Sequence, residues 1–192
     1  MPLTVTIHNN LSHLSGIHFM LNYATLQRLI GIALLREGPQ NLPASQNLMF
    51  VLALATAAIN YPGIVLYTPD VQPLLQLGLL LGFNAAFVYI ALALRNLRPR
   101  FVQSMSALFG TDALISAVAL PVLFLLGPPA AGEAGAGSGV AAIAFLLLLV
   151  WNIAVVNHIL RQALDVTRFI GLLITLGYIF GASVFVFMVT GA

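Results

Sequence analysis

The chain has 192 residues, of which 60% are hydrophobic and only 6% are charged, and its formal net charge is +2. Soluble domains carry about a quarter charged residues, so this composition excludes an ordinary water-soluble fold and predicts a membrane protein. The net charge is too small to indicate a nucleic-acid partner. The absence of cysteine excludes disulfides, thiolate metal sites and cysteine nucleophiles.

Residues 1–19 form a polar leader that contains His8, His13 and His18. A spacing of five residues places successive histidines about 140° apart on a helix and on opposite faces of a strand, so we expect no metal site here and no cofactor. The leader lacks a basic start followed by an apolar core, which argues against a cleaved signal peptide.

Residues 20–45 are predicted to form an amphipathic helix and a linker. Polar or small residues recur every third position at Asn22, Thr25, Arg28 and Gly31. The pattern is typical of a helix lying in the lipid headgroup region, and equally of a cytoplasmic helix packed on the inner ends of the membrane spans. Glycine and prolines in the segment 37–46, EGPQNLPASQ, then end the helix.

Five apolar runs make residues 46–192 an all-α, polytopic membrane helix bundle. Each reaches the ~20 residues that a helix needs to cross the hydrocarbon core. The first run is interrupted by Asn-Tyr-Pro-Gly at 60–63, which predicts a kink near the outer interface. The five expected transmembrane helices are 46–66, 72–95, 102–126, 139–160 and 168–190.

The distribution of arginine predicts the orientation. The connections at 67–71 and 127–138 contain no arginine, whereas every arginine falls on the other side of a five-span bundle. The N-terminus is therefore expected in the cytoplasm and the C-terminus in the periplasm of a bacterial inner membrane. We expect lipid-headgroup or topology roles for Arg28, Arg36, Arg95, Arg98 and Arg100; Arg161 and Arg168 complete the set.

Asp112 is the most costly residue to place in a membrane. It falls about 15 Å along the third span, and Asn84, Asn152 and Tyr178 fall at similar depth on their own spans. A buried carboxyl group needs a partner, so these four residues, with Thr111, are predicted to form an intramembrane polar layer. The layer is either a set of structural hydrogen bonds between helices or part of an ion or proton path.

Small residues predict close helix contacts on two spans. Gly78 and Gly82, followed by Ala86, have GxxxG-type spacing on the second span, and Gly177 and Gly181 have it on the fifth. Such faces let two helix backbones approach closely. They fit packing within the bundle or a homodimer interface.

A polar cluster is predicted at the cytoplasmic end of the fourth span. Arg161 and Asp165 have helical i, i+4 spacing, as do Asn157 and Arg161, and His158 and Gln162. His158 is expected to be a hydrogen-bonded structural residue, with titration or headgroup binding as the alternative. The cluster comprises Asn157, His158, Arg161, Asp165 and Arg168.

Three segments resemble the Yip1 domain family, in particular its bacterial members. They are RNLRPRFVQSMSALFG at 95–110, VWNIAVVNHILRQAL at 150–164 and LLREGPQNLPASQNL at 34–48. The resemblance implies five helices, a cytoplasmic N-terminus and no catalytic residues. Eukaryotic members of the family organise membrane traffic without enzymatic activity, through small GTPases and one another.

No serine-hydrolase elbow, zinc-protease motif, P-loop or dinucleotide fingerprint occurs in the sequence. We therefore expect a non-catalytic integral membrane protein that acts by association with the lipid bilayer, a second copy of itself or a membrane-protein partner. The alternative is a small transporter or channel that uses the polar layer around Asp112.

Overall fold

The computed structural model describes residues 23–68, 70–127 and 138–191, and within these ranges every regular element is helical. The leader with its three histidines, Asn22 and residues 128–137 lie outside the described residues. The elements are α2 (Tyr23–Ala33), η1 (Pro39–Asn41), α3 (Gln46–Tyr67), α4 (Pro73–Leu94), η2 (Arg98–Arg100), α5 (Phe101–Leu126), α6 (Ser138–Leu164) and α7 (Arg168–Thr190).

Helices α3 to α7 are long and apolar enough to cross a membrane, which confirms the prediction of a five-helix membrane bundle. Ser45 caps α3 by accepting a hydrogen bond from the backbone N–H of Leu48 at 3.3 Å. The 60–63 segment does not end this helix, which runs through Pro62 to Tyr67. A membrane helix tolerates proline because neighbouring groups can satisfy the carbonyl that proline leaves unpaired.

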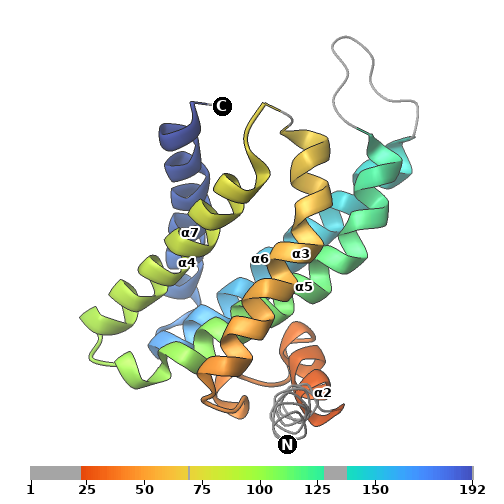
Figure 1. The fold of residues 1–192 in the computed structure, drawn as a ribbon. Helices are drawn as coiled ribbons and strands as arrows, with labels where there is room; N and C mark the ends of the chain where they lie inside the picture. Colours follow the sequence, from red (N-terminus) through yellow and green to blue (C-terminus); the bar gives the residue numbers. More distant parts are fainter. Residues whose placement is uncertain (1–22, 69, 128–137, 192) are drawn as a thin grey trace, which may run out of the picture.

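The bundle has two distinct ends (Figure 1). We call the end that carries η2, the C-terminus of α6 and the N-terminus of α7 the arginine-rich end, and the opposite one the far end. Helix α5 packs extensively against α3 on one side and α6 on another, whereas α4 lies beside α7. Helix α2 lies near the arginine-rich end, and the C-terminal ends of α3 and α7 lie at the far end (Figure 1).

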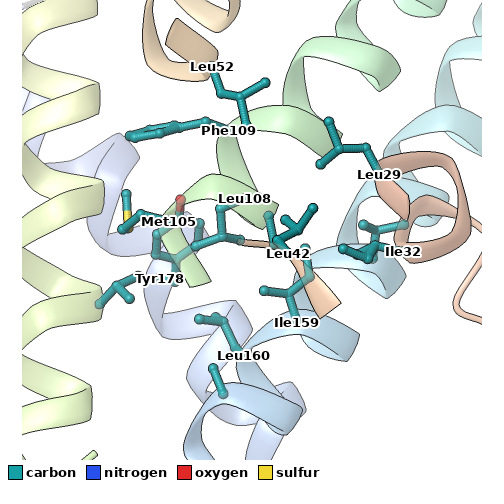
Figure 2. Close-up of a cluster of buried hydrophobic side chains, with 14 of the residues drawn as sticks. Leu29, Ile32, Leu42, Leu52, Met105, Leu108, Phe109, Ile159, Leu160 and Tyr178 are labelled. Atoms are coloured by element: carbon teal, nitrogen blue, oxygen red, sulfur yellow. The ribbon is translucent and has the colours of Figure 1, made fainter. Parts of the chain in front are cut away.

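The hydrophobic core lies toward the arginine-rich end (Figure 2). It joins Leu29 and Ile32 of α2 and Leu42 of the linker to Met105 of α5 and Ile159 of α6. Helix α2 and the linker are therefore part of the same packed unit as the spans. Of the two interpretations left open for α2, the structure has the helix packed on the bundle.

The buried face of α2 differs from the face that its polar stripe indicates. Thr25, a member of the stripe, is buried together with Leu29, whereas Leu26 and Ile30 are exposed. The indole N–H of Trp151 donates a hydrogen bond to the carbonyl of Ala33 at 2.9 Å, which fixes the C-terminal end of α2 against α6. Apolar side chains thus remain on the outer face of α2.

Three helices end in the same way at the arginine-rich end, with a residue in the left-handed region. These residues are Leu35, Asn96 and Asp165, with φ values of 60°, 58° and 54°. In each case the next backbone N–H bonds the carbonyl five residues earlier, as in a Schellman motif: Arg36 to Gly31, Leu97 to Leu92 and Val166 to Arg161.

The third of these endings corrects the predicted side-chain pair of Arg161 and Asp165. Helix α6 ends at Leu164, so Asp165 lies beyond the helix and the i, i+4 spacing no longer brings the two side chains together.

Candidate functional site

A chain of hydrogen bonds joins α3 to α5 inside the membrane-spanning region. The hydroxyl of Thr56 donates to the carbonyl of Phe109 at 2.6 Å. The amide nitrogen of Asn60 donates to the Thr56 carbonyl and to Asp112 Oδ2, both at 3.0 Å. Ser116 Oγ donates to Asn60 Oδ1, also at 3.0 Å. The Asn60 amide thus uses both its donors and its acceptor, and the network fixes its orientation.

Asp112 also borders a cavity of about 320 Å³ that is lined by residues of all five spans. The four residues of the predicted polar layer, Asn84, Asp112, Asn152 and Tyr178, all line it. Thr56, Asn60, Thr111 and Ser183 add further polar groups, and the remaining lining is aliphatic apart from Phe109. The structure therefore brings the whole predicted layer to one cavity.

Most of the layer lacks hydrogen-bond partners among the described residues. Asp112 accepts a hydrogen bond at Oδ2, and no described residue donates to its Oδ1. The side-chain amides of Asn84 and Asn152 and the hydroxyl of Tyr178 make no hydrogen bond within the described part of the chain. Tyr178 is only 8% exposed, and its ring packs edge-on against Phe87 at 5.4 Å between centroids. These polar groups are available to something that occupies the cavity.

The cavity extends toward the far end. Ile64 lies three residues before the end of α3, and Leu77 lies four residues after the start of α4, so both are within about 6 Å of the far end along their helices. Toward the arginine-rich end, Met105, Val88 and Ile159 fill the bundle with no more than 1% exposure. These residues belong to the hydrophobic core, which therefore fills the bundle between the cavity and the arginine-rich end.

The polar cluster predicted on α6 divides into separate environments. His158 Nε2 lies 2.8 Å from the Glu37 carbonyl and 2.8 Å from Gln162 Nε2, so the histidine and its i+4 neighbour hold the linker before α3. Gln40 and Gln103 extend the same network, with Gln103 donating to the Leu42 carbonyl at 2.7 Å.

The other members of this cluster lie elsewhere. Asn157 faces α7. Its Oδ1 is buried and has no hydrogen-bond partner among the described residues, and a Cβ added at Gly171 would lie 2.8 Å from it. Asp165 follows α6, and Arg168 begins α7. The five predicted residues are therefore not one constellation.

Several of the predicted lipid-facing arginines have structural contacts. The Arg100 guanidinium donates to the carbonyls of Gln162 and Ala163 at 3.3 and 3.2 Å, where the last carbonyls of α6 lack helical partners. Arg28 donates to the Asn41 carbonyl at 2.7 Å, and Arg98 lies 6.0 Å from the centre of the Tyr89 ring. These contacts fasten the connections at the arginine-rich end.

Arg95 stands at an apolar groove of about 350 Å³ between α4 and α7. Its Nη2 donates to the Asp165 carbonyl at 3.2 Å. The other lining residues are all hydrophobic: Phe87, Ile90, Ala91, Leu94, Leu164, Val166 and Ile174. A cation thus borders an otherwise apolar groove at the arginine-rich end.

The predicted glycine faces differ from one another. A Cβ added at Gly181 would lie 2.9 Å from the Phe83 ring of α4, so this position is a close contact between helices. At Gly78, Gly82 and Gly177 nothing lies within 4 Å of an added Cβ. The prediction of close packing within the bundle is wrong at these three positions, because their faces point to space that the described residues leave open.

Sequence reasoning missed Thr56, Asn60 and Ser116 as parts of the site. The sequence places Asn60 near Pro62, where it indicates a helix break. Thr56 and Asn60 nevertheless have i, i+4 spacing, as do Asp112 and Ser116. A polar pair with helical spacing on each of two spans is the sequence signal that could have identified the hydrogen-bonded contact between α3 and α5.

Comparisons with known proteins add no relative. No family model, no curated protein and no solved structure matches this chain. Within the described residues, no group of three histidine, aspartate or glutamate side chains has the arrangement to hold a metal ion.

Proposed function

We propose that this chain is a non-catalytic membrane protein of a bacterial inner membrane that acts by binding anionic lipid at its arginine-rich end. The groove between α4 and α7 carries this proposal, because its lining is apolar except for Arg95. An acyl chain fits the apolar lining, and the phosphate of the same lipid pairs with the guanidinium. A non-catalytic, membrane-organising role is also what the resemblance to the Yip1 domain family implies.

Orientation supports this placement. All the arginines lie on the side that the positive-inside rule assigns to the cytoplasm, with the N-terminus inside and the C-terminus in the periplasm. The cytoplasmic leaflet is the one that attracts basic groups near the membrane surface. The groove therefore opens at the depth where anionic headgroups lie.

Native mass spectrometry in mild detergent tests the proposal. Wild-type protein is expected to retain anionic phospholipid. The R95Q variant is expected to lose it, and A91F, which fills the groove and leaves the charge in place, should do the same. R168Q is the matched control, since Arg168 lies at the same end outside the groove lining. Equal lipid retention by all four proteins would overturn the proposal, and the same spectra report a second copy or a bound protein.

A second candidate is a small transporter that uses the layer around Asp112. The cavity favours it, because several polar side chains there lack partners. Flux into proteoliposomes that disappears in D112A and persists in D70N would support this candidate. Lipid retention unaffected by R95Q together with such a flux would replace the first proposal with the second.

A further inference from the structure

We infer that the cavity around Asp112 is a binding site for a small organic cation, with an ammonium group beside the carboxylate and an apolar body against the aliphatic lining. The inference concerns binding alone, and it holds whether or not the ligand crosses the membrane. It is independent of the lipid groove, which lies at the other end of α4.

Charge is the first argument. Asp112 is the only charged residue in the cavity lining. Arg100 precedes it by twelve residues, about 18 Å along the helix direction, and donates to the end of α6. A carboxyl group at this depth requires a partner, and Asn60 supplies a neutral one to Oδ2 only. A cation that enters the cavity provides the missing positive charge at Oδ1.

Hydrogen bonding is the second argument. An ammonium group has up to three N–H donors and no acceptor. The acceptors that lack partners around the cavity are Asp112 Oδ1, the side-chain oxygens of Asn84 and Asn152, and the Tyr178 hydroxyl oxygen. Asn84, Asn152 and Tyr178 can also donate, whereas an ionised carboxylate only accepts, so Asp112 is the group that favours an ammonium over a neutral ligand.

Size and lining favour an organic cation over an inorganic one. A volume of about 320 Å³ is far larger than a metal ion and lies in the range of small-molecule sites, which combine apolar walls with a few polar groups. Leu77, Leu80, Leu81, Leu149 and Ile153 supply such walls. A metal ion bound by oxygen would instead require a closely spaced oxygen shell.

Access is from the far end, which the orientation proposed above places on the periplasmic side. Ile64 and Leu77 lie at the shallow part of the lining, and the core around Met105 closes the deep part. A ligand can therefore reach Asp112 from the far end without any opening of the arginine-rich end.

Isothermal titration calorimetry of the full chain in nanodiscs tests the site with 4-phenylbutylamine and its neutral counterpart 4-phenylbutan-1-ol. The amine is protonated at pH 7 because alkylamines have pKa values near that of lysine, about 10.4. We expect saturable binding of the amine that is about tenfold tighter than binding of the alcohol. In D112N the amine should bind no better than the alcohol.

D70N is the matched control, because it makes the same chemical change at an exposed position of the far end. It should leave amine binding unchanged, which separates the site from general attraction to negative charge. N84L provides an independent variant that keeps the carboxylate, and it should weaken amine binding. Equal binding of amine and alcohol to the wild-type protein overturns the inference. So does amine binding that survives in D112N, or an Asp112-dependent response to NaCl without any response to the amine.

Discussion

The Asn60 side chain of α3 donates a hydrogen bond to Asp112 Oδ2 of α5 at 3.0 Å, inside the region that lipid surrounds. The two helices share the most extensive contact in the bundle. The bond therefore lies where the packing is most continuous. It fixes the carboxyl group through Oδ2, and Asp112 also lines the cavity.

A double-mutant cycle with N60A and D112A measures this bond. We expect each single variant to lower the free energy of unfolding, and we expect a coupling energy of about 0.5–1.5 kcal/mol, the range found for hydrogen bonds between membrane helices. Reversible unfolding in mixed detergent micelles provides the measurement. Pairing N60A with S183A is the control cycle, since the Ser183 hydroxyl bonds the Ile179 carbonyl within α7. Additive effects of N60A and D112A would contradict the assigned contact.

Gly110 allows α2 to dock on α5. A Cβ added at Gly110 would lie 2.5 Å from Leu29 Cδ2, so G110V should force α2 away and lower stability by about 1–3 kcal/mol. Trp151 is the single tryptophan of the chain, and its indole N–H donates to the carbonyl of Ala33 at the end of α2. Displacement of α2 in G110V should therefore shift the Trp151 emission to longer wavelength than in the wild-type protein. G78V is the matched control, because nothing lies within 4 Å of an added Cβ there. An unchanged Trp151 spectrum in G110V would show that α2 does not depend on this contact.

Leu35 has a left-handed backbone conformation, with φ at 60°. Glycine adopts this conformation without strain, so L35G is expected to raise the free energy of unfolding by about 0.5–1 kcal/mol. Thermal unfolding of the protein in nanodiscs measures the change. I30G is the control in the helical part of α2, and it should lower stability by about 1 kcal/mol. A loss of stability in L35G would mean that the side chain contributes more than the backbone strain removes.

Arg100 binds two carbonyls at the end of α6 with its guanidinium. R100K retains the charge but has fewer donors and a different geometry, so we expect it to lower stability by about 1 kcal/mol without changing topology. Accessibility mapping of both ends reports topology, and unfolding in detergent reports stability. R168K should change neither, because the Arg168 side chain makes no hydrogen bond within the described ranges. Equal stability of the two variants would argue against the capping role of Arg100.

The spans could be predicted from the sequence because length and hydropathy alone determine them. Each of α3 to α7 is an apolar run that starts or ends within a few residues of the expected position, and only α6 extends notably further, to Leu164. Depth on a helix is also readable from sequence, since residues rise by a constant distance. Asn84, Asp112, Asn152 and Tyr178 therefore reach the same cavity as expected from their depth.

The rotation of each helix about its own axis, and therefore which face points to lipid, cannot be predicted from the sequence in the same way. Lipid and protein interior are both apolar, so the faces of α4 and α7 carry little contrast. Gly78, Gly82 and Gly177 consequently gave no indication that they point away from other helices. Which helices pack side by side is also set by the tertiary structure. The packing of α3 on α5 is what brings Asn60 within hydrogen-bond distance of Asp112.

The arginines near the helix ends are relevant to membrane insertion as well as to the folded structure. The positive-inside rule predicts that arginines hold a loop on one side of the membrane during insertion. Three of them also bind carbonyls in the fold: Arg28 binds that of Asn41, Arg95 that of Asp165, and Arg100 those of Gln162 and Ala163. Any cation satisfies the first task, whereas the second requires the branched guanidinium. We therefore expect Arg28, Arg95 and Arg100 to act first as charges during membrane insertion and then as hydrogen-bond donors in the finished fold. A residue with both roles is better served by arginine than by lysine, and the sequence has seven arginines and no lysine.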